Sequence, residues 1–399
     1  MTERKLREAL RQAPIDPAAR ERSWRVVEAA YRELPRSAHG RAQPRARRIG
    51  LVLAACLAVA LAVTAVTRAP TDAVARWLRD AVGAGDAAPR STLDRLPADA
   101  RLLVSAGGSA WVVAPDGVKR RLGRYAGASW SPRGLFVVAW QGRELTALEP
   151  DGDVRWSFGG DATVRTARWS PGDGYRIAYV AGSALRIVNG NGTGNRRFAA
   201  TRSHVAPAWR PGAGHVLAWL DVRGRVRVTD VDSGRQLWAA SAIGDVRELA
   251  WSDDGRALLL RAEDGAAVLR EGGRRRALIA PISRRPQAAA VAASWTPDGR
   301  VALVLRDRAA DRDELVVVDP SSGRRRRLLA VPGRLGPPAW SPDGRVLLLP
   351  WPDADEWLLL RLGRRGRRVD AVEDLAAQFA PGAARGRFPS AVEWAPAAP

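Results

Sequence analysis

Most of the chain follows one repeating pattern of apolar and polar positions, and this pattern predicts β-strands. Each repeat opens on a tryptophan, continues with a polar stretch such as Ser-Pro-Asp-Gly and then has two short apolar runs at hairpin distance. Ser, Pro and Gly suit the first, second and fourth positions of a type I turn, where Pro supplies the fixed φ angle. A further turn and a basic stretch ending in an apolar residue complete the repeat. We therefore expect four short strands in each repeat.

The spacing of the tryptophans indicates a β-propeller. The six repeat motifs begin 39 to 45 residues apart, a period typical of propeller blades. A large flat side chain at this position can pack between neighbouring blades, so we expect the repeat tryptophans to be structural anchors. The anchors are Trp130, Trp169, Trp209, Trp251, Trp295, Trp340 and, near the C-terminus, Trp394.

The two ends of the repeat region predict how the ring closes. The segment from Arg101 has two apolar strands, an Asp-Gly turn and a basic strand, but it lacks the leading tryptophan strand. The segment around Trp394 is such a strand with nothing after it. Together the two ends would complete one blade, so six contiguous blades and one split blade give an all-β propeller of seven blades. An insertion before Trp394 contains residues 371–379, which we expect to form a short helix.

The Trp-Ser-Pro-Asp-Gly turn at residues 340–344, followed by a hairpin, resembles the WD-repeat-like propellers of the TolB type. The resemblance covers residues 95–396 and implies a propeller fold for this part of the chain. Two features depart from TolB, which is a free periplasmic protein. A separate N-terminal α/β domain is missing, and a tail and an anchor precede the repeats. Fold resemblance does not transfer function.

An apolar run at residues 49–67 contains no charged residue, and it predicts a transmembrane helix over residues 49–68. At its length such a helix spans about 28 Å, close to the hydrocarbon thickness of a bilayer. Arginines crowd the N-terminal side of the run, whereas the C-terminal side has fewer arginines and interspersed aspartates. The positive-inside rule then places residues 1–48 in the cytoplasm and the propeller outside. We expect a single-pass protein of a bacterial cell membrane.

Residues 1–48 are expected to hold two short helices and a basic linker. The second helix has an apolar stripe at intervals of three and four residues, formed by Trp24, Val27, Tyr31 and Leu34. So small a segment cannot bury much surface alone, and the stripe needs the other helix, the membrane surface or a protein to pack against. These four residues are a candidate partner-binding face. Residues 69–94 are typical of a linker with one short helix.

The amino-acid composition limits the kinds of binding site that the chain can form. The chain has 64 basic and 42 acidic residues, a formal net charge of +22, and all but two of the basic residues are arginine. Arginine-rich runs at 119–121, 274–276 and 324–327 follow the last turn of their repeats. We expect them on exposed outer strands, where charge prevents edge-to-edge aggregation, and we do not expect a specific nucleic-acid site. The single cysteine, Cys56, excludes an intrachain disulfide and a paired-cysteine zinc site.

No catalytic motif is present: the sequence has no nucleophile elbow, no His-Glu-x-x-His and no P-loop. Two acidic runs, 311–314 and 353–356, could bind calcium weakly, but they lack the spacing of a calcium loop. The glycine-rich run at 189–195 is expected to be a turn. We therefore predict no catalytic residue, no cofactor and no metal site, and a protein that is not an enzyme.

The predicted layout resembles that of membrane-bound anti-sigma factors, although the zinc-binding motif of that group, a His followed by Cys-x-x-Cys, is absent. The resemblance implies a cytoplasmic tail that contacts a partner such as a sigma factor. The propeller would bind a protein, peptide or envelope ligand outside the cytoplasm. Two alternatives stay open. One is a TolB-like envelope scaffold or binding protein without signalling, and the other is a propeller hydrolase or lyase with an unidentified site.

Overall fold

The computed structural model describes residues 93–396, except 173–174, 202–203, 213, 242–243, 263–264, 279–287, 364–365, 380–386 and 390. The chain divides into two compact units, Met1–Gly83 and Ala84–Pro399, and all described residues belong to the second. The predicted cytoplasmic segment, the predicted span and nearly all of the predicted linker lie outside the described residues. Within residues 93–396, the described helices are all too short or too polar to cross a membrane.

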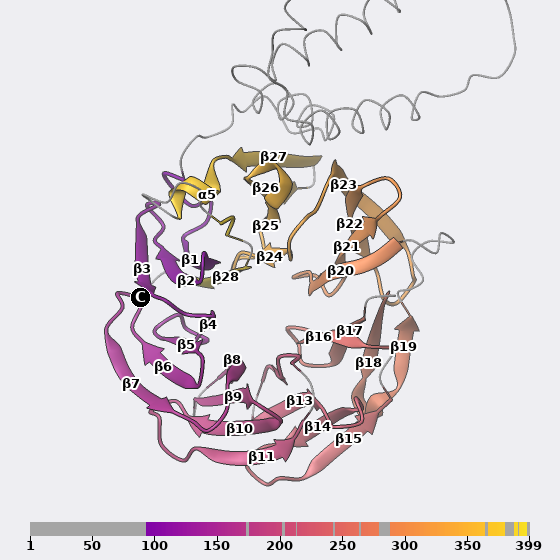
Figure 1. Cartoon of the computed structure of the whole chain (residues 1–399). Coiled ribbons are helices and arrows are strands. Elements are labelled where there is room, and N and C mark those ends of the chain that lie inside the picture. The colour runs from indigo at the N-terminus through magenta and orange to yellow at the C-terminus, as the bar shows by residue number, and fades with distance from the viewer. Residues whose placement is uncertain are drawn as a thin grey trace, which may run out of the picture. The chain divides into compact units, whose positions relative to one another are not determined.

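Seven four-stranded antiparallel sheets form the blades of a closed ring (Figure 1). Blade 1 combines β28 with β1 to β3, and blades 2 to 7 each use four consecutive strands, starting with β4 to β7. The inner strands are β28 (Ala391–Pro396), β4 (Gly127–Trp130), β8 (Val164–Trp169), β12 (Ala208–Trp209), β16 (Val246–Trp251), β20 (Ala288–Trp295) and β24 (Ala339–Trp340). The second strands are β1 (Ala100–Ala106), β5 (Val137–Gln141), β9 (Arg176–Ala181), β13 (Val216–Leu220), β17 (Ala257–Ala262), β21 (Val301–Asp307) and β25 (Val346–Trp351).

The other half of each blade lies farther from the axis of the ring. The third strands are β2 (Ser109–Val113), β6 (Glu144–Leu148), β10 (Ala184–Asn189), β14 (Val226–Asp230), β18 (Gly265–Arg270), β22 (Arg312–Val318) and β26 (Glu356–Gly363). The outer strands are β3 (Lys119–Gly123), β7 (Val154–Gly159), β11 (Arg196–Ala200), β15 (Gln236–Ala240), β19 (Arg275–Leu278), β23 (Arg325–Pro332) and β27 (Gly366–Val372). The prediction of an all-β propeller with seven blades is confirmed.

The turns define two faces of the ring. Turns that join inner to second strands and third to outer strands lie at one end of every blade. We name this end the Trp-turn face, because each tryptophan motif turns there. Turns that join second to third strands, and the links between blades, lie at the other end, which we name the loop face. A functional surface on one face is therefore built from a different set of connections than a surface on the other.

The tryptophan motif forms a tight hydrogen-bonded turn. In blade 7 the Gly344 N–H donates to the Ser341 carbonyl oxygen at 2.8 Å, and the Val346 N–H donates to Ser341 Oγ at 3.0 Å. Ser341 Oγ in turn donates to the carboxylate of Asp343 at 2.5 Å. Gly344 has φ +67°, a backbone angle that favours glycine. Serine, aspartate and glycine thus each have a physical reason to occupy their place in the motif.

The ring closes in blade 1, next to blade 7, and we name this region the seam. There β28 pairs with β1 in antiparallel register, with Trp394 opposite Leu102. The predicted split blade is therefore confirmed. The pairing covers an edge of β1 that would otherwise expose unpaired backbone groups.

The insertion before β28 fills the seam. A short helix was expected over residues 371–379, but β27 continues to Val372 and the helix α5 spans only Leu375–Gln378. Asp374 has a left-handed backbone, with φ +55°, which separates the strand from the helix. Directly after α5, Phe379 is buried between Trp111 of blade 1 and Trp357 of blade 7. The insertion thus connects blade 7 to β28 of blade 1 and also supplies apolar packing between these two blades.

The arginine-rich runs lie on the rim of the ring, as predicted. Lys119–Arg121 begin β3, Arg275 and Arg276 begin β19, and Arg325–Arg327 begin β23. Each of these strands is the outermost of its blade (Figure 1). Their free edges therefore carry charges, which oppose pairing with another sheet.

Candidate functional site

The repeat tryptophans connect neighbouring blades. Five of the seven indole N–H groups donate to the carbonyl oxygen of the residue that precedes the tryptophan of the preceding blade. The pairs are Trp130 with Glu393 (3.2 Å), Trp209 with Arg168 (2.9 Å), Trp251 with Ala208 (3.1 Å), Trp295 with Ala250 (2.9 Å) and Trp394 with Ala339 (3.1 Å). The indole N–H groups of Trp169 and Trp340 have no hydrogen-bond partner among the described residues. These side chains hold the scaffold together and do not form a ligand surface.

This difference between the tryptophans allows a matched test. Trp251→Phe removes an interblade hydrogen bond, whereas Trp169→Phe removes an indole N–H that has no partner in the described structure. Both side chains are buried to a similar degree. We expect Trp251→Phe to reduce the free energy of unfolding by about 0.5–1.5 kcal/mol more than Trp169→Phe does. Chemical denaturation of both variants measures the difference, and equal losses would show that the hydrogen bond adds no net stability.

The candidate partner-binding face formed by Trp24, Val27, Tyr31 and Leu34 lies outside the described residues. The structure therefore neither places these side chains nor brings them together.

One carboxyl group on an inner strand is unusual. Glu393 on β28 accepts a hydrogen bond from Ser129 Oγ at 3.3 Å. Burial raises the pKa of the Glu393 carboxyl, and the nearby charge of Arg168 opposes this only in part. General acid–base catalysis needs a group placed against a reacting atom, usually with a second partner. The Glu393 carboxylate instead faces Ser129 of blade 2 and the charge of Arg168 in blade 3, which is a structural arrangement.

A larger group of charged side chains lies on the loop face between blades 6 and 7. We name it the loop platform and define it by Arg306, Asp311, Asp313, Arg334 and Asp353. The three aspartates come from the two acidic runs identified in the sequence. Their arginine partners were missed, because one lies on a different strand and the other in the link to the next blade. A pattern search along the chain does not bring such segments together.

The blade 6 half of the loop platform is centred on Arg306. Its guanidinium contacts the carboxylates of Asp311 at 2.5 Å and Asp313 at 3.2 Å, and it donates to the Gly333 carbonyl oxygen at 2.6 Å. Asp313 is almost fully buried, and its second oxygen accepts the Leu335 N–H at 2.7 Å. Burial raises the pKa of the Asp313 carboxyl, although the charge of Arg306 and the hydrogen bond from Leu335 lower it. These contacts tie the link between blades 6 and 7 to blade 6.

The blade 7 half is a bidentate ion pair. Arg334 Nη2 lies 2.7 Å from Asp353 Oδ1, and the Arg334 backbone N–H donates to Asp353 Oδ2 at 2.7 Å. Burial acts to raise the pKa of Asp353, but the hydrogen bonds and charge of Arg334 outweigh it and hold that pKa below its ordinary value. The link between the blades is therefore held from both sides, with much of the Arg334 side chain exposed to solvent. A fixed, charged loop surface costs less entropy to bind than a mobile one.

The loop platform can recognise charged and hydrogen-bonding groups, but it does not resemble a metal or catalytic centre. Each of its three aspartates is engaged by an arginine. Within residues 93–396, the described side chains include no group of three that could hold a metal ion. The acidic runs, considered for weak calcium binding from the sequence, are here parts of an ion-pair network.

Gly333 offers a test of the platform's rigidity. It has φ +75°, and an added Cβ would collide with the Asp353 carboxylate. Gly323 has nearly the same angle, φ +70°, but an added Cβ there has open space. We expect Gly323→Ala to cost about 1 kcal/mol of stability, and Gly333→Ala to cost about 2–4 kcal/mol because it also displaces Asp353. Denaturation curves of the two variants measure the difference. Equal losses in the free energy of unfolding would show that the Asp353 side chain moves aside without cost.

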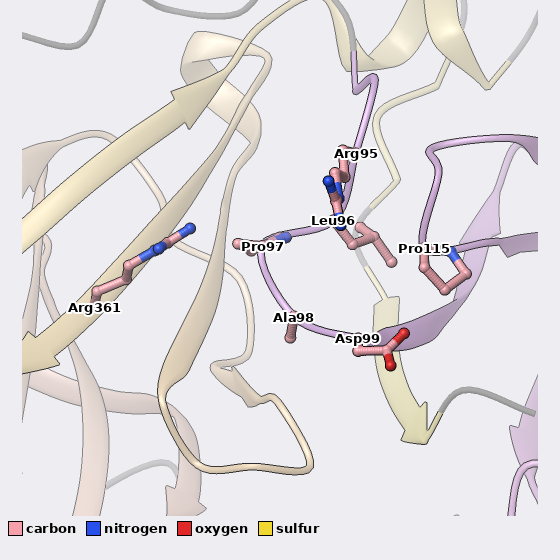
Figure 2. Close-up of a pocket in the computed structure, with 7 residues that line it drawn as sticks. All are labelled: Arg95, Leu96, Pro97, Ala98, Asp99, Pro115 and Arg361. Carbon is pink, nitrogen blue, oxygen red and sulfur yellow. The ribbon is translucent and has the colours of Figure 1, made fainter. Parts of the chain in front are cut away.

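A pocket of about 270 Å³ lies at the seam, near the Trp-turn face (Figure 2). Residues 95–99, which lead into β1, form one side of it, together with Pro115. Arg361 on β26 of blade 7 reaches toward it from the other side (Figure 2). The volume suits a small polar group better than a drug-sized ligand.

Comparison with solved structures identifies the architecture. The C-terminal WD40 domain of Sif2 is similar with a TM-score of 0.55 and 14% identity, covering 70% of this chain and 84% of that domain. The fold is that of a seven-bladed WD40-like β-propeller. The β-propeller domain of Cps50 (Swd1) from Myceliophteria thermophila has a TM-score of 0.51 and 17% identity, with 63% and 89% covered. A chain of the mitotic checkpoint complex has a TM-score of 0.50 and 16% identity, with 72% and 86% covered.

Comparison by sequence adds little to this. No protein-family model matches the chain. A stretch of 55 residues is 36% identical to the uncharacterized peptidase YuxL of Bacillus subtilis strain 168. The stretch covers 14% of this chain and 8% of that peptidase, so the match is little longer than one blade repeat. A match of this length transfers no activity.

Proposed function

We propose that the propeller is a binding scaffold that holds a protein or peptide ligand on its loop face. The observation that carries the proposal is the loop platform, where exposed charged groups are held in place by contacts from two blades. Arg334 supplies an exposed guanidinium, and Asp311 supplies an exposed carboxylate. Ordered polar groups of both signs suit a peptide or protein surface. A similar fold within the mitotic checkpoint complex supports a role in assembly, since that propeller is part of a multi-protein structure.

Two charge-reversing variants test the loop face against the Trp-turn face. Arg334→Glu changes the platform, and Arg345→Glu makes the same charge change on the opposite face, where the side chain is 85% exposed. The full chain carrying each variant is used to capture partners from its native host. A partner retained by wild type and Arg345→Glu but lost by Arg334→Glu supports binding on the loop face. Equal capture by all three proteins would contradict it.

We also propose that residues 49–68 anchor the propeller in a bacterial cell membrane, with residues 1–48 in the cytoplasm. The uncharged run and the arginine asymmetry of its flanks support this arrangement. The cytoplasmic segment would then contact a second partner, as in an anti-sigma-like regulator. If it has no partner, the protein is an envelope scaffold without signalling.

The tail proposal is tested by binding to residues 1–48 in the full chain. Capture of a cytoplasmic protein by wild type, and its loss in Trp24→Ala or Tyr31→Ala, is expected if the apolar stripe is the contact. Val27 and Leu34 extend the same stripe, so their alanine variants should weaken capture in the same direction. A tail that captures nothing favours the scaffold.

A further inference from the structure

Among the strands of the propeller, the excess of positive charge is greatest at the rim of the ring. The seven outer strands contain thirteen basic residues and one acidic residue. The seven third strands, which pair with the outer strands on the side of the ring axis, contain five basic and five acidic residues. An edge needs only an occasional charge to avoid pairing with other sheets. The excess of basic over acidic residues on the outer strands therefore also favours an anionic binding partner.

Two arginines at the seam lie closer together than protection of a strand edge requires. Arg361 on β26 lies directly opposite Arg368 on the outer strand β27. Like charges in this position repel one another. Both share the single carboxylate of Asp370, at 3.9 Å from Arg361 and 3.0 Å from Arg368. The pair keeps a net positive charge, with the Arg361 side chain 49% and the Arg368 side chain 63% exposed, so an anion would relieve the repulsion.

Arg361 also borders the pocket at the seam, opposite Arg95. Figure 2 shows its guanidinium directed toward Pro97 from the blade 7 side, while the carboxylate of Asp99, on the blade 1 side, points away from Arg361. We name Arg95, Asp99 and Arg361 the seam site. Two guanidinium groups are well suited to the oxygens of a phosphate. Asp99 can accept a hydrogen bond from a hydroxyl group on the same ligand.

The seam site lies where the preceding chain joins the propeller. Leu96 N–H donates to the Pro115 carbonyl oxygen at 2.9 Å, which fixes this segment beside the turn between β2 and β3 on the Trp-turn face. Residues 69–92 connect this point to the proposed membrane span. A tether of this kind keeps the seam site at high effective concentration near the bilayer surface.

We propose that the seam site binds the phosphate of an anionic phospholipid with a hydroxyl-bearing headgroup, such as phosphatidylglycerol, so that the Trp-turn face docks on the membrane. The inference rests on the proposed membrane anchoring. Arg95 and Arg361 hold the phosphate, and Asp99 accepts the headgroup hydroxyl. The arginines of the rim add attraction to the anionic surface. Docking leaves the loop face directed away from the bilayer and open to its ligand.

The test uses the full chain in nanodiscs of phosphatidylcholine alone or mixed with phosphatidylglycerol. Hydrogen exchange of residues 95–121 is the readout. We expect the mixed lipid to slow exchange on the order of tenfold, and high salt to remove the effect. The double variant Arg95→Gln/Arg361→Gln should lose this protection. The matched control Arg197→Gln/Arg235→Gln removes two exposed rim arginines from blades 3 and 4 and should retain it.

Other outcomes overturn the proposal. Equal exchange in the two lipids excludes docking, and equal loss in both variants assigns the effect to diffuse rim charge. Protection by soluble glycerol phosphate in phosphatidylcholine nanodiscs assigns the seam site to a free ligand. Thermal melting of each variant shows whether it is folded, and the single variant Arg361→Gln replaces the double variant if the latter is not.

Carbonate extraction tests the anchoring separately. If the chain leaves the membrane, the proposed span is wrong, and flotation of the free chain with phosphatidylglycerol vesicles then decides headgroup binding directly. A chain that stays anchored but shows no lipid-dependent protection overturns the docking alone.

Discussion

Replacing Phe379 with alanine is expected to lower the free energy of unfolding by about 3–5 kcal/mol. The ring is 2% exposed and packs edge-on against Trp111, with ring centroids 5.9 Å apart. On its other side the centroid of Trp357 lies 5.5 Å away. Because Phe379 fills the space between blades 1 and 7, its removal leaves a cavity beside the blade whose β28–β1 pairing closes the ring. Rigid tryptophans on both sides limit how far the cavity can collapse.

Urea denaturation followed by tryptophan fluorescence measures this loss. Phe379→Leu is the control, because it keeps most of the apolar volume and should cost clearly less. If alanine and leucine destabilise the protein equally, the loss comes from the aromatic contacts of the ring and not from the cavity. If neither does, the insertion is not part of the cooperative fold.

Deleting residues 391–399 is expected to prevent the ring from closing. The deletion removes β28, so β1 loses its antiparallel partner and Trp394 no longer reaches Ala339 of blade 7. Leu102 and Val104 on β1 are fully buried in the intact protein, and the deletion uncovers their strand. We expect the melting temperature to fall by at least about 10 °C. We also expect the exposed edge to cause association between molecules.

Light scattering during gel filtration and thermal melting by circular dichroism test this expectation. The control deletes only residues 397–399, which follow β28. A monomeric protein with an unchanged melting temperature after the longer deletion would show that blade 1 is stable with three strands. Aggregation after both deletions would point to a cause other than β28.

The pattern of the chain predicted the fold well because a propeller is built from local hairpins. Each tryptophan motif specifies a turn through Ser341, Asp343 and Gly344 or their equivalents, and each apolar run specifies a strand. The closing strand could be recognised because Trp394 has the motif's first residue without the strands that should follow. Arginine runs were placed on the rim for the same reason, since they follow the last turn of their repeats.

The candidate sites could not be predicted in the same way. Asp311 and Asp353 were visible as acidic residues, but Arg306 and Arg334 gave no sign that they would engage them. The insertion suggested a helix over 371–379, whereas its main contribution is the buried ring of Phe379. Nothing in the local sequence at Arg95 or Arg361 indicates that they border one pocket.

The amino-acid sequence thus established the number of blades, their order and the way in which the ring closes, because these follow from turns and hairpins between residues near one another in the chain. The contacts between blades were settled by packing in three dimensions. The Arg334–Asp353 ion pair, the packing of Phe379 and the pocket bordered by Arg95 and Arg361 each join segments that no single hairpin contains. Such contacts depend on how the twisted sheets lie against one another. The repeat of apolar and polar residues along the chain does not specify that geometry.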